Sequence, residues 1–312
     1  MTKPQFTKIR TRMLVEIYVE IDDFCKSDPI ISQMWNISRS GRHCRLTLSE
    51  IMTIVVHYHH KSFKNFKSYY LEYVLKELRN DFPDLVSYTR FVELIPRAFR
   101  PLCLFLNYRC SLSEKTGIYY IDSAPWRVCN HKRAHQHKVM RGFADWGKTS
   151  VGWFFGLKYH LITNQNGELM KFYVSSGNIS DANAKVLHLL TKDLFGWLFG
   201  DKGYLLNEAK RTFIERDGCL KVFSKCRKNM KKQNIPVEAS LWIRKRGVIE
   251  SVIDITKNTC NSVHSRHRSP INAFSNLFAG LVAYTFRPHK PSTKINLEAR
   301  LLPMPKKLAS AA

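Results

Sequence analysis

The sequence is poor in acidic residues, and this shortage is its strongest compositional bias. Its 312 residues hold 25 Asp and Glu against 50 Lys and Arg, a formal net charge of +25. Hydrophobic residues make up 44% of the chain and aromatic residues 12%, which is typical of a folded protein and not of a disordered basic tail. A folded chain with this much positive charge usually binds a polyanion. Nucleic acid is therefore the first candidate partner, and an anionic membrane surface is the second.

Long apolar runs and closely spaced cysteine pairs are also missing. The most apolar stretch, residues 273–286, is interrupted by Ser275 and Asn276 and is shorter than the 18 or so residues that suggest a membrane span. The N-terminal residues lack the apolar segment of a signal peptide. We therefore expect no membrane association and a cytoplasmic location. The eight cysteines include no Cys-x-x-Cys pair, so neither a zinc ribbon nor a disulfide framework is expected.

The first 115 residues have the patterns of helices. Thr47-x-x-Glu50 is typical of a capping box before an apolar helix, and residues 88–106 repeat apolar side chains at helical spacing. This predicts a helical N-terminal domain over residues 1–115, whose expected role is DNA binding. Residues 88–99 are either the recognition helix of a helix-turn-helix or an ordinary core helix.

From about residue 116 the patterns are those of strands alternating with helices. A buried strand is predicted at 118–121 and stops at Asp122, and a second at 197–200 stops at Asp201. Between them the sequence predicts a long hairpin, 151–163 with 168–175, and a helix through Leu190 that Ser180 and Asp181 cap. The predicted elements that follow are a helix at 206–216, a strand at 220–224 and a helix at 238–257. This order predicts a mixed sheet with helices on its faces.

Three carboxylates stand out in a chain with few acids. Asp122 and Asp201 follow predicted strands, and neighbouring strands can bring such ends together. Glu250 lies on a predicted helix that can pack across that sheet. Three carboxylates that meet would form an oxygen-ligand site for Mg²⁺ or Mn²⁺. Two such ions can activate a water or a 3′-hydroxyl and stabilise the leaving oxygen in phosphodiester cleavage.

Two cations share the predicted helix with Glu250. Arg246, Glu250 and Lys257 stand at relative positions 0, +4 and +11, about one face of a helix. One interpretation is a simple Arg-Glu ion pair one turn apart. The other places two phosphate-binding cations beside a metal ligand.

Together, these motifs resemble those of the DDE transposases of bacterial insertion sequences, in the group with a Tyr-Arg-Glu-Lys signature. The resemblance rests on Ile-Asp122-Ser, Gly-Asp201-Lys-Gly-Tyr204 and Arg246-x3-Glu250-x6-Lys257, supported by Gly152-Trp-Phe-Phe-Gly-x-Lys158-x-His160 and His264-Ser-Arg-His-Arg-Ser269. It covers roughly residues 116–290. The signature tyrosine would fall at Ile243, which puts one phosphate or base contact in doubt. Only about a dozen residues, 227–238, stand where some relatives carry a β insertion, so a compact version is expected.

The resemblance implies a ribonuclease-H-like α/β fold, a mixed sheet with flanking helices, over a catalytic domain at 116–290. A basic C-terminal tail, 291–312, would follow it. In this fold Asp122, Asp201 and Glu250 would bind two divalent cations, Mg²⁺ or Mn²⁺. The residues expected to contact DNA are Arg246, Lys257, Lys202, Tyr204 and Trp126.

Residues 126–155 contain two other patterns, a group of cysteine and histidine residues and a group of aromatic residues. Cys129, His131, His135 and His137 have zinc-ligand chemistry, but the lysines and arginines among them favour a basic loop that holds DNA. The aromatic residues of this stretch could stack on unpaired bases. Trp153 and its neighbours Phe154 and Phe155 are expected in the core, because they stand in a predicted strand. Trp126, just past Asp122, is the better candidate for a DNA contact.

The sequence thus predicts a transposase that binds terminal inverted repeats, cleaves the DNA ends by metal-dependent hydrolysis, and joins the 3′-hydroxyls to double-stranded target DNA. Because two ends are paired in one complex, a dimer is expected on DNA. One rival is a metal nuclease of the same fold that performs no joining. A second rival is an inactive or domesticated DNA-binding protein.

Overall fold

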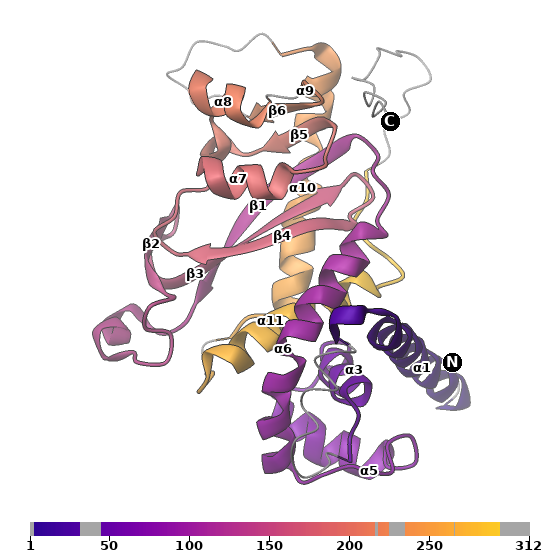
Figure 1. Cartoon of the computed structure of the whole chain (residues 1–312). Helices are drawn as coiled ribbons and strands as arrows, with labels where there is room; N and C mark the ends of the chain where they lie inside the picture. The colour runs from indigo at the N-terminus through magenta and orange to yellow at the C-terminus, as the bar shows by residue number, and fades with distance from the viewer. Residues whose placement is uncertain (1–2, 32–44, 216–217, 225–234, 265, 294–312) are drawn as a thin grey trace. The chain divides into compact units, whose positions relative to one another are not determined.

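The computed structural model describes residues 3–31, 45–215, 218–224, 235–264 and 266–293. By its contacts the chain forms two compact units, and both are discontinuous in sequence (Figure 1). The first unit contains Met1–Arg109, Ile255–Val263 and His267–Arg287. The second contains Cys110–Asp254, His264–Arg266 and Pro288–Ala312. Residues 255–263 and 267–287, which the sequence assigned to the catalytic domain, thus pack with the N-terminal helices.

The described part of the first unit is helical. Its elements are α1 (Lys3–Ser27), α3 (Leu48–Tyr58), α4 (Phe66–Ser68), η1 (Tyr69–Val74), α5 (Leu75–Glu77), α6 (Tyr88–Ser111), η4 (Ile255–Thr259) and α11 (Pro270–Thr285). The predicted capping box is confirmed, since the Thr47 hydroxyl accepts from the Glu50 N–H and the Glu50 carboxylate accepts from the Thr47 N–H. Helix α6 buries Phe91, Leu94 and Ala98 on one side, as a core helix does.

The segment after Glu250 is built into the N-terminal helices at several points. His59 Nδ1 lies 2.5 Å from the Cys260 carbonyl oxygen, and the Asn261 amide donates to the Tyr58 hydroxyl at 3.0 Å. Helix α11 packs against α3. Gly280 of α11 lies close against the preceding loop, because a Cβ there would stand 2.5 Å from the Ser262 Cβ. The C-terminal segment is therefore part of the first unit's core.

The second unit is built on a six-stranded mixed sheet. Its strands are β1 (Ile118–Arg127), β2 (Asp145–Thr149), β3 (Gly152–Asn164), β4 (Leu169–Ser176), β5 (Gly196–Gly200) and β6 (Leu220–Ser224). The order is β2-β3-β1-β5-β6, and β4 pairs with β3. Strand β3 pairs antiparallel with β1, β2 and β4. Strand β5 runs parallel to both of its neighbours, β1 and β6.

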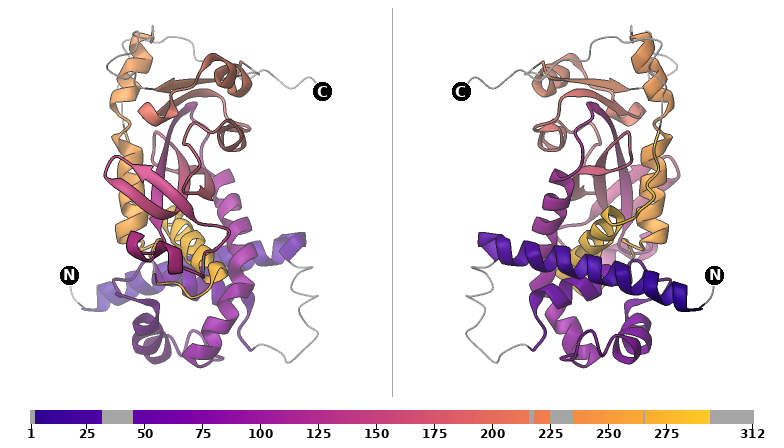
Figure 2. Two further views of the ribbon diagram at one scale, coloured as in Figure 1. Left: turned by 90° about the vertical axis from the view of Figure 1, so that its left-hand side faces the viewer. Right: turned by 90° about the vertical axis from the view of Figure 1, so that its right-hand side faces the viewer.

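Helices cover both faces of this sheet (Figure 2). On one face α7 (Ala184–Thr191) and α8 (Glu208–Ile214) share a core with Tyr119, Ile121 and Leu198. On the other face α9 (Val237–Arg244) packs against β5 and β6, and α10 (Gly247–Asp254) packs against β1. The remaining short elements are η2 (His131–Gln136) and η3 (Lys202–Tyr204). The predicted α/β class, a mixed sheet with flanking helices after a helical N-terminal region, is confirmed.

Some local predictions were wrong. Strand β1 does not stop at Asp122 but continues to Arg127, because β3 pairs with it along this whole length. Strand β2 was not predicted. Helix α7 is capped by the Asn183 side chain and not by Ser180 and Asp181. The helix predicted at 238–257 is broken into α9 and α10 by a turn at Lys245 and Arg246.

Two predictions concern residues outside the described ranges. Residues 227–234 of the compact connection predicted at 227–238, and residues 294–312 of the basic tail predicted at 291–312, lie outside the described ranges. Among the helices of the described residues, none is long and apolar enough to cross a membrane.

Candidate active site

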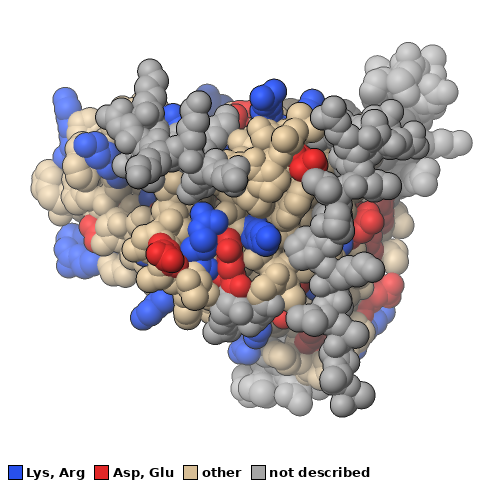
Figure 3. Space-filling model, turned by 90° about the horizontal axis from the view of Figure 1, so that it is seen from above, with Lys and Arg blue, Asp and Glu red and all other residues tan. Residues whose placement is uncertain are grey.

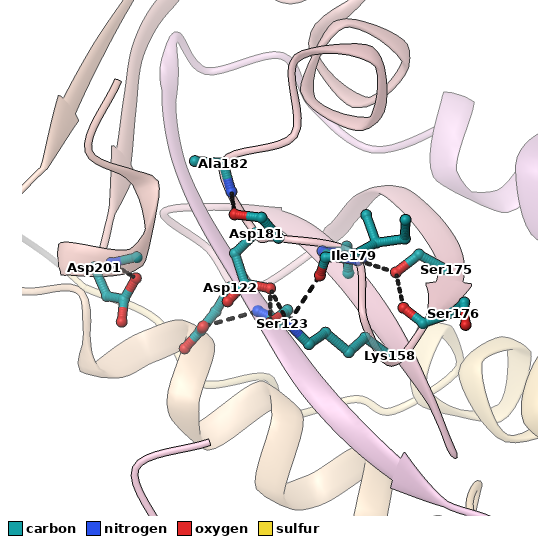
Figure 4. A network of polar contacts seen from close by, with 12 residues as sticks. Asp122, Ser123, Lys158, Ser175, Ser176, Ile179, Asp181, Ala182 and Asp201 are labelled. Atoms are coloured by element: carbon teal, nitrogen blue, oxygen red, sulfur yellow. Dashed lines mark hydrogen bonds and ion pairs between the residues drawn. The ribbon is translucent and has the colours of Figure 1, made fainter. Parts of the chain in front are cut away.

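Asp122 lies on β1, and Asp201 directly follows β5, the neighbouring parallel strand. Tyr120 of β1 is opposite Phe199 of β5, and this pair is the last in their register. Asp122 and Asp201 each stand two residues beyond that pair. Their side chains approach one region of the sheet (Figure 4), as expected for equivalent positions at the same edge of a parallel pair.

The environment of Asp122 disfavours its negative charge. Burial, with a smaller contribution from the charge of Asp201, raises the pKa of this carboxyl group to about 6, although Arg246 and the Ser123 N–H act to lower it. The Asp201 carboxylate accepts a hydrogen bond from the Gly203 N–H at 2.7 Å. The two acids therefore form a close pair of oxygen donors with mutual repulsion, which an additional cation would relieve.

Arg246 connects Asp122 with Glu250. Its Nη1 lies 3.1 Å from Asp122 Oδ2, and its Nη2 donates to Glu250 Oε1. The arginine side chain is 14% exposed, whereas that of Glu250 is 59% exposed. The predicted Arg-Glu pair is thus present, and the guanidinium also reaches the strand acid. In this arrangement Glu250 meets Arg246 and not the two aspartates.

A third aspartate, Asp181, which the sequence suggested only as a helix cap, lies near Asp122 and Asp201. Asp181 Oδ1 accepts from the Ser123 hydroxyl at 2.8 Å and from Lys158 Nζ at 3.1 Å, and Lys158 also donates to the Ile179 carbonyl at 3.0 Å (Figure 4). Successive side chains of a strand point to opposite faces. Asp122 therefore meets Arg246 on one face of β1, and Ser123 meets Asp181 on the other.

Gly203 brings Asp181 and Asp201 into one neighbourhood. A Cβ at this glycine would lie 2.9 Å from Asp201 Oδ1 and 3.5 Å from Asp181 Oδ2. The buried ring of Tyr204 stands next to it, and burial, aided by the charges of Asp122, Asp181 and Asp201, raises the pKa of its hydroxyl well above the usual value. The phenol stays neutral, so it adds no negative charge to the acids.

Lys158 and His160, from the supporting motif, are both held inside the sheet. They are alternate residues of β3 and are buried. His160 Nε2 lies 2.8 Å from the Ser175 hydroxyl oxygen, and burial lowers the pKa of this imidazole to about 4. The histidine is therefore neutral near pH 7, and the lysine is the cation that faces Asp181.

The acids fit a divalent cation only in part. Asp122 and Asp201 provide the hard oxygen ligands that Mg²⁺ and Mn²⁺ prefer, and their repulsion favours a bound cation. The Glu250 carboxylate is paired with Arg246. Within the part of the chain that the structure describes, no three His, Cys, Asp or Glu side chains come close enough to hold a metal ion. The fit therefore rests on the two strand aspartates.

The predicted DNA contacts differ in their exposure. Lys202 is exposed beside Asp201, and Arg246 is bound to the two acids. Tyr204 and Trp126 are buried, and the Trp126 indole N–H lies 3.4 Å from the His264 carbonyl oxygen. Their rings are thus enclosed by protein, unlike the surface contacts predicted for them. Lys257 belongs to the first unit.

The aromatic residues predicted for the core also differ from expectation. Phe154 is buried, but Trp153 is 62% exposed. The alternation of strand β3 explains this, because Trp153 and Phe154 point to opposite faces. On the face shown in Figure 3, lysines and arginines are spread among acids and do not form one block. On the visible part of this face, therefore, charge alone does not locate a binding site.

The sequence matches a family model. The model is that of the transposase DDE domain, and its match spans residues 112–270, just over half of the chain. This chain belongs to the transposase DDE domain family. The matched segment contains the strand aspartates, Arg246 and Glu250.

Comparisons with other proteins add one similar structure. It is a piggyBac transposase synaptic complex with hairpin DNA, determined by cryo-electron microscopy, with a TM-score of 0.46 and 10% sequence identity. The similarity covers 86% of this chain and 71% of that one. No curated protein matches this sequence.

Proposed function

We propose that this protein is the transposase of a bacterial insertion sequence, of the group with the Tyr-Arg-Glu-Lys signature. It binds the terminal inverted repeats of its element, cleaves the DNA ends by hydrolysis, and joins the 3′-hydroxyls to target DNA. The observation that carries the proposal is the parallel placement of Asp122 and Asp201, with Arg246 joining Asp122 to Glu250. Membership of the transposase DDE domain family supports it.

In this proposal Asp122 and Asp201 hold one divalent ion, Mg²⁺ or Mn²⁺, and Glu250 completes a second site. The ions, when bound, supply activation of the attacking hydroxyl and neutralisation of the leaving oxygen. The raised pKa of Asp122 reflects a carboxylate that lacks full compensation for its charge. A cation at this position therefore gains from both the burial and the crowding of the acids.

The cations around the acids have a separate role in the proposal. Arg246 and Lys202 contact phosphates of the element's end, because an arginine fork and a flexible ammonium group both suit phosphate oxygens. Lys257 contributes another phosphate contact from the first unit. The protein acts as a dimer that holds two ends, in the bacterial cytoplasm where the nucleoid lies. The helical residues 1–115 form the DNA-binding domain and residues 116–290 carry the catalytic domain, although residues 255–263 and 267–287 pack with the first unit.

The test uses the full chain with a supercoiled plasmid that carries both ends of the element. Wild type should nick at the end boundaries with Mg²⁺ and then give joined products, and EDTA should prevent both. Asp201→Asn should bind the ends within about twofold of wild type but fail to cut them. The matched control is Asp193→Asn, which makes the same substitution at an exposed acid after α7.

A second measurement reports the ion without catalysis. Mn²⁺ should raise the thermal midpoint of the wild type and of Asp193→Asn, but much less that of Asp201→Asn, since a ligand that binds the folded state stabilises it. Nicking without any joining would favour the nuclease rival. Specific end binding with no metal-dependent cut would favour an inactive or domesticated DNA-binding protein.

A further inference from the structure

The hairpin of β2 and β3 has one inner and one outer face. Its register places Trp146 opposite Phe155 and Lys148 opposite Trp153. These four side chains share one face, which we call the hairpin face. Phe154 points the other way and is buried, and its ring lies so close to Gly147 that a Cβ there would stand 2.5 Å from it. The hairpin is thus anchored by its inner face and presents the outer one.

The hairpin face exposes aromatic rings that a protein core would normally enclose. Trp153 is 62% exposed and Trp146 is 41% exposed. The rings of Trp146 and Phe155 meet edge to face at 5.6 Å, and Lys148 Nζ lies 5.5 Å from the centre of the Trp153 ring. Exposed Phe143 and Val151 stand close by in sequence. Clustered exposed apolar side chains of this kind mark interaction sites.

The surroundings of these rings are strongly basic. Element η2 packs against β3, and the segment between β1 and the hairpin carries most of the local charge. The exposed cations from the end of β1 to Trp153 are Arg127, Lys132, Arg133, Lys138, Arg141 and Lys148. The single acid in this stretch is Asp145, whose Oδ2 accepts from the Asn178 amide at 2.7 Å. The partner of the hairpin face is therefore expected to be a polyanion.

Exposed aromatic rings beside cations favour nucleic acid with unpaired bases over a fully paired duplex. In a duplex the bases are stacked on each other and offer only their edges in the grooves. An unpaired base offers its face, and aromatic side chains beside a basic surface bind such bases. A second copy of the chain would place the six cations opposite another six, which their repulsion opposes.

We propose that the hairpin face binds unpaired DNA bases by stacking on Trp153 and Trp146, with the neighbouring cations holding the backbone. This rests on the proposed function, because it names the form of DNA that the transposase holds near its acids. Gly156 pairs with Arg127 of β1, five residues beyond Asp122, and Phe155 and Trp153 lie one and three residues further along β3. At about 3.3 Å per residue, Trp146, which is opposite Phe155, and Trp153 lie about 20 Å and about 26 Å along the sheet from Asp122. The stacked bases would then lie about six to eight nucleotides from the cleaved phosphate.

The test measures binding of the full chain, in EDTA, to two end-sequence duplexes by fluorescence anisotropy. One duplex is fully paired, and the other has three unpaired nucleotides, one of them 2-aminopurine, about six to eight nucleotides from the cleavage position. Trp153→Ala should weaken binding to the unpaired substrate about tenfold or more and change binding to the paired duplex less than twofold. Trp153→Phe should restore most of the loss. Leu189→Ala, at another exposed apolar residue of the same unit, should leave both affinities unchanged.

Several results would overturn the inference. Equal losses on both duplexes would assign Trp153 a role independent of unpaired bases, and no loss on either would remove it from DNA binding. A change in the sedimentation of the DNA-free protein on Trp153→Ala would make the face a protein interface. The proposed function can fail independently of this inference. If the wild type never cuts DNA but binds unpaired bases through Trp153, the transposase activity is refuted and the role of the hairpin face stands. A Trp153→Ala variant that cuts and binds as wild type does refutes the hairpin face alone.

Discussion

The buried ion pair between Lys158 and Asp181 gives a stability prediction that the structure makes quantitative. Their side chains are 10% and 28% exposed, and Lys158→Met would leave the aspartate with only the Ser123 hydroxyl as a donor. Removing one partner of a buried pair costs about 3–5 kcal/mol. Because Asp181 keeps some exposure and one hydrogen bond, we expect about 3 kcal/mol. Asp181→Asn should cost about 1–2 kcal/mol, since Lys158 keeps the Ile179 carbonyl and the new amide oxygen as acceptors and the amide can still bond to Ser123.

The double variant decides whether the pair acts as a unit. Lys158→Met with Asp181→Asn should be less destabilised than the sum of the single variants by about 2 kcal/mol, because neither charge is left alone. The measurement is urea unfolding followed by far-ultraviolet circular dichroism, with an unchanged dependence on urea as the condition for comparing variants. Additive effects, or a loss below about 0.5 kcal/mol for Lys158→Met, would refute the argument from burial.

Burial lowers the pKa of His57 and brings that of His60 to about 4. The unfolded chain takes up these protons first as the pH falls, so stability should be full above about pH 7 and decline between pH 6.5 and 4. The decline should approach 1.4 kcal/mol per pH unit for each histidine, and His60→Asn should reduce the slope in urea titrations. For Asp122 the raised pKa has the opposite sign: its contribution is present below pH 4 and is lost as the pH rises to about 6. Asp201→Asn should lower this pKa in carboxyl-carbon NMR titrations in EDTA, and an unchanged value would show that the acids do not interact. Gly203→Ala places a methyl group 2.9 Å from Asp201 Oδ1 and should reduce cleavage by about 100-fold through misplacement, with the thermal midpoint nearly unchanged. A variant that cuts normally would contradict the close approach.

The sequence predicted the position of the two aspartates well, because each follows a short apolar run that is typical of a buried strand. Short apolar and aromatic runs before Asp122 and Asp201 indicated two buried strands, and parallel pairing then brings equivalent positions together. One of the two interpretations of the spacing of Arg246 and Glu250 was an ion pair one turn apart, and this pair is present. The connection from Arg246 to Asp122 could not be predicted, because it depends on how α10 packs on β1.

Other features depend on pairing that no local pattern contains. The first strand was predicted to stop at Asp122, yet β1 continues because β3 pairs with it, and Pro125 is tolerated where β5 no longer flanks β1. Asp181 fits a helix cap by its local sequence, whereas its partner Lys158 is on another strand. The exposure of Trp153 and the burial of Trp126 follow from which face of each strand meets the core.

The discontinuous first unit has a consequence for the order of synthesis. Residues 255–263 and 267–287 complete the core of the N-terminal helices, with contacts such as His59 to Cys260 and α3 to α11. A ribosome releases the N-terminal helices long before it makes these residues. The first unit therefore cannot finish folding until residues 267–287 have been made, and a fragment that stops after Glu250 would lack part of this core. Any premature stop or frameshift between the codons for residues 255 and 287 should thus impair the N-terminal unit.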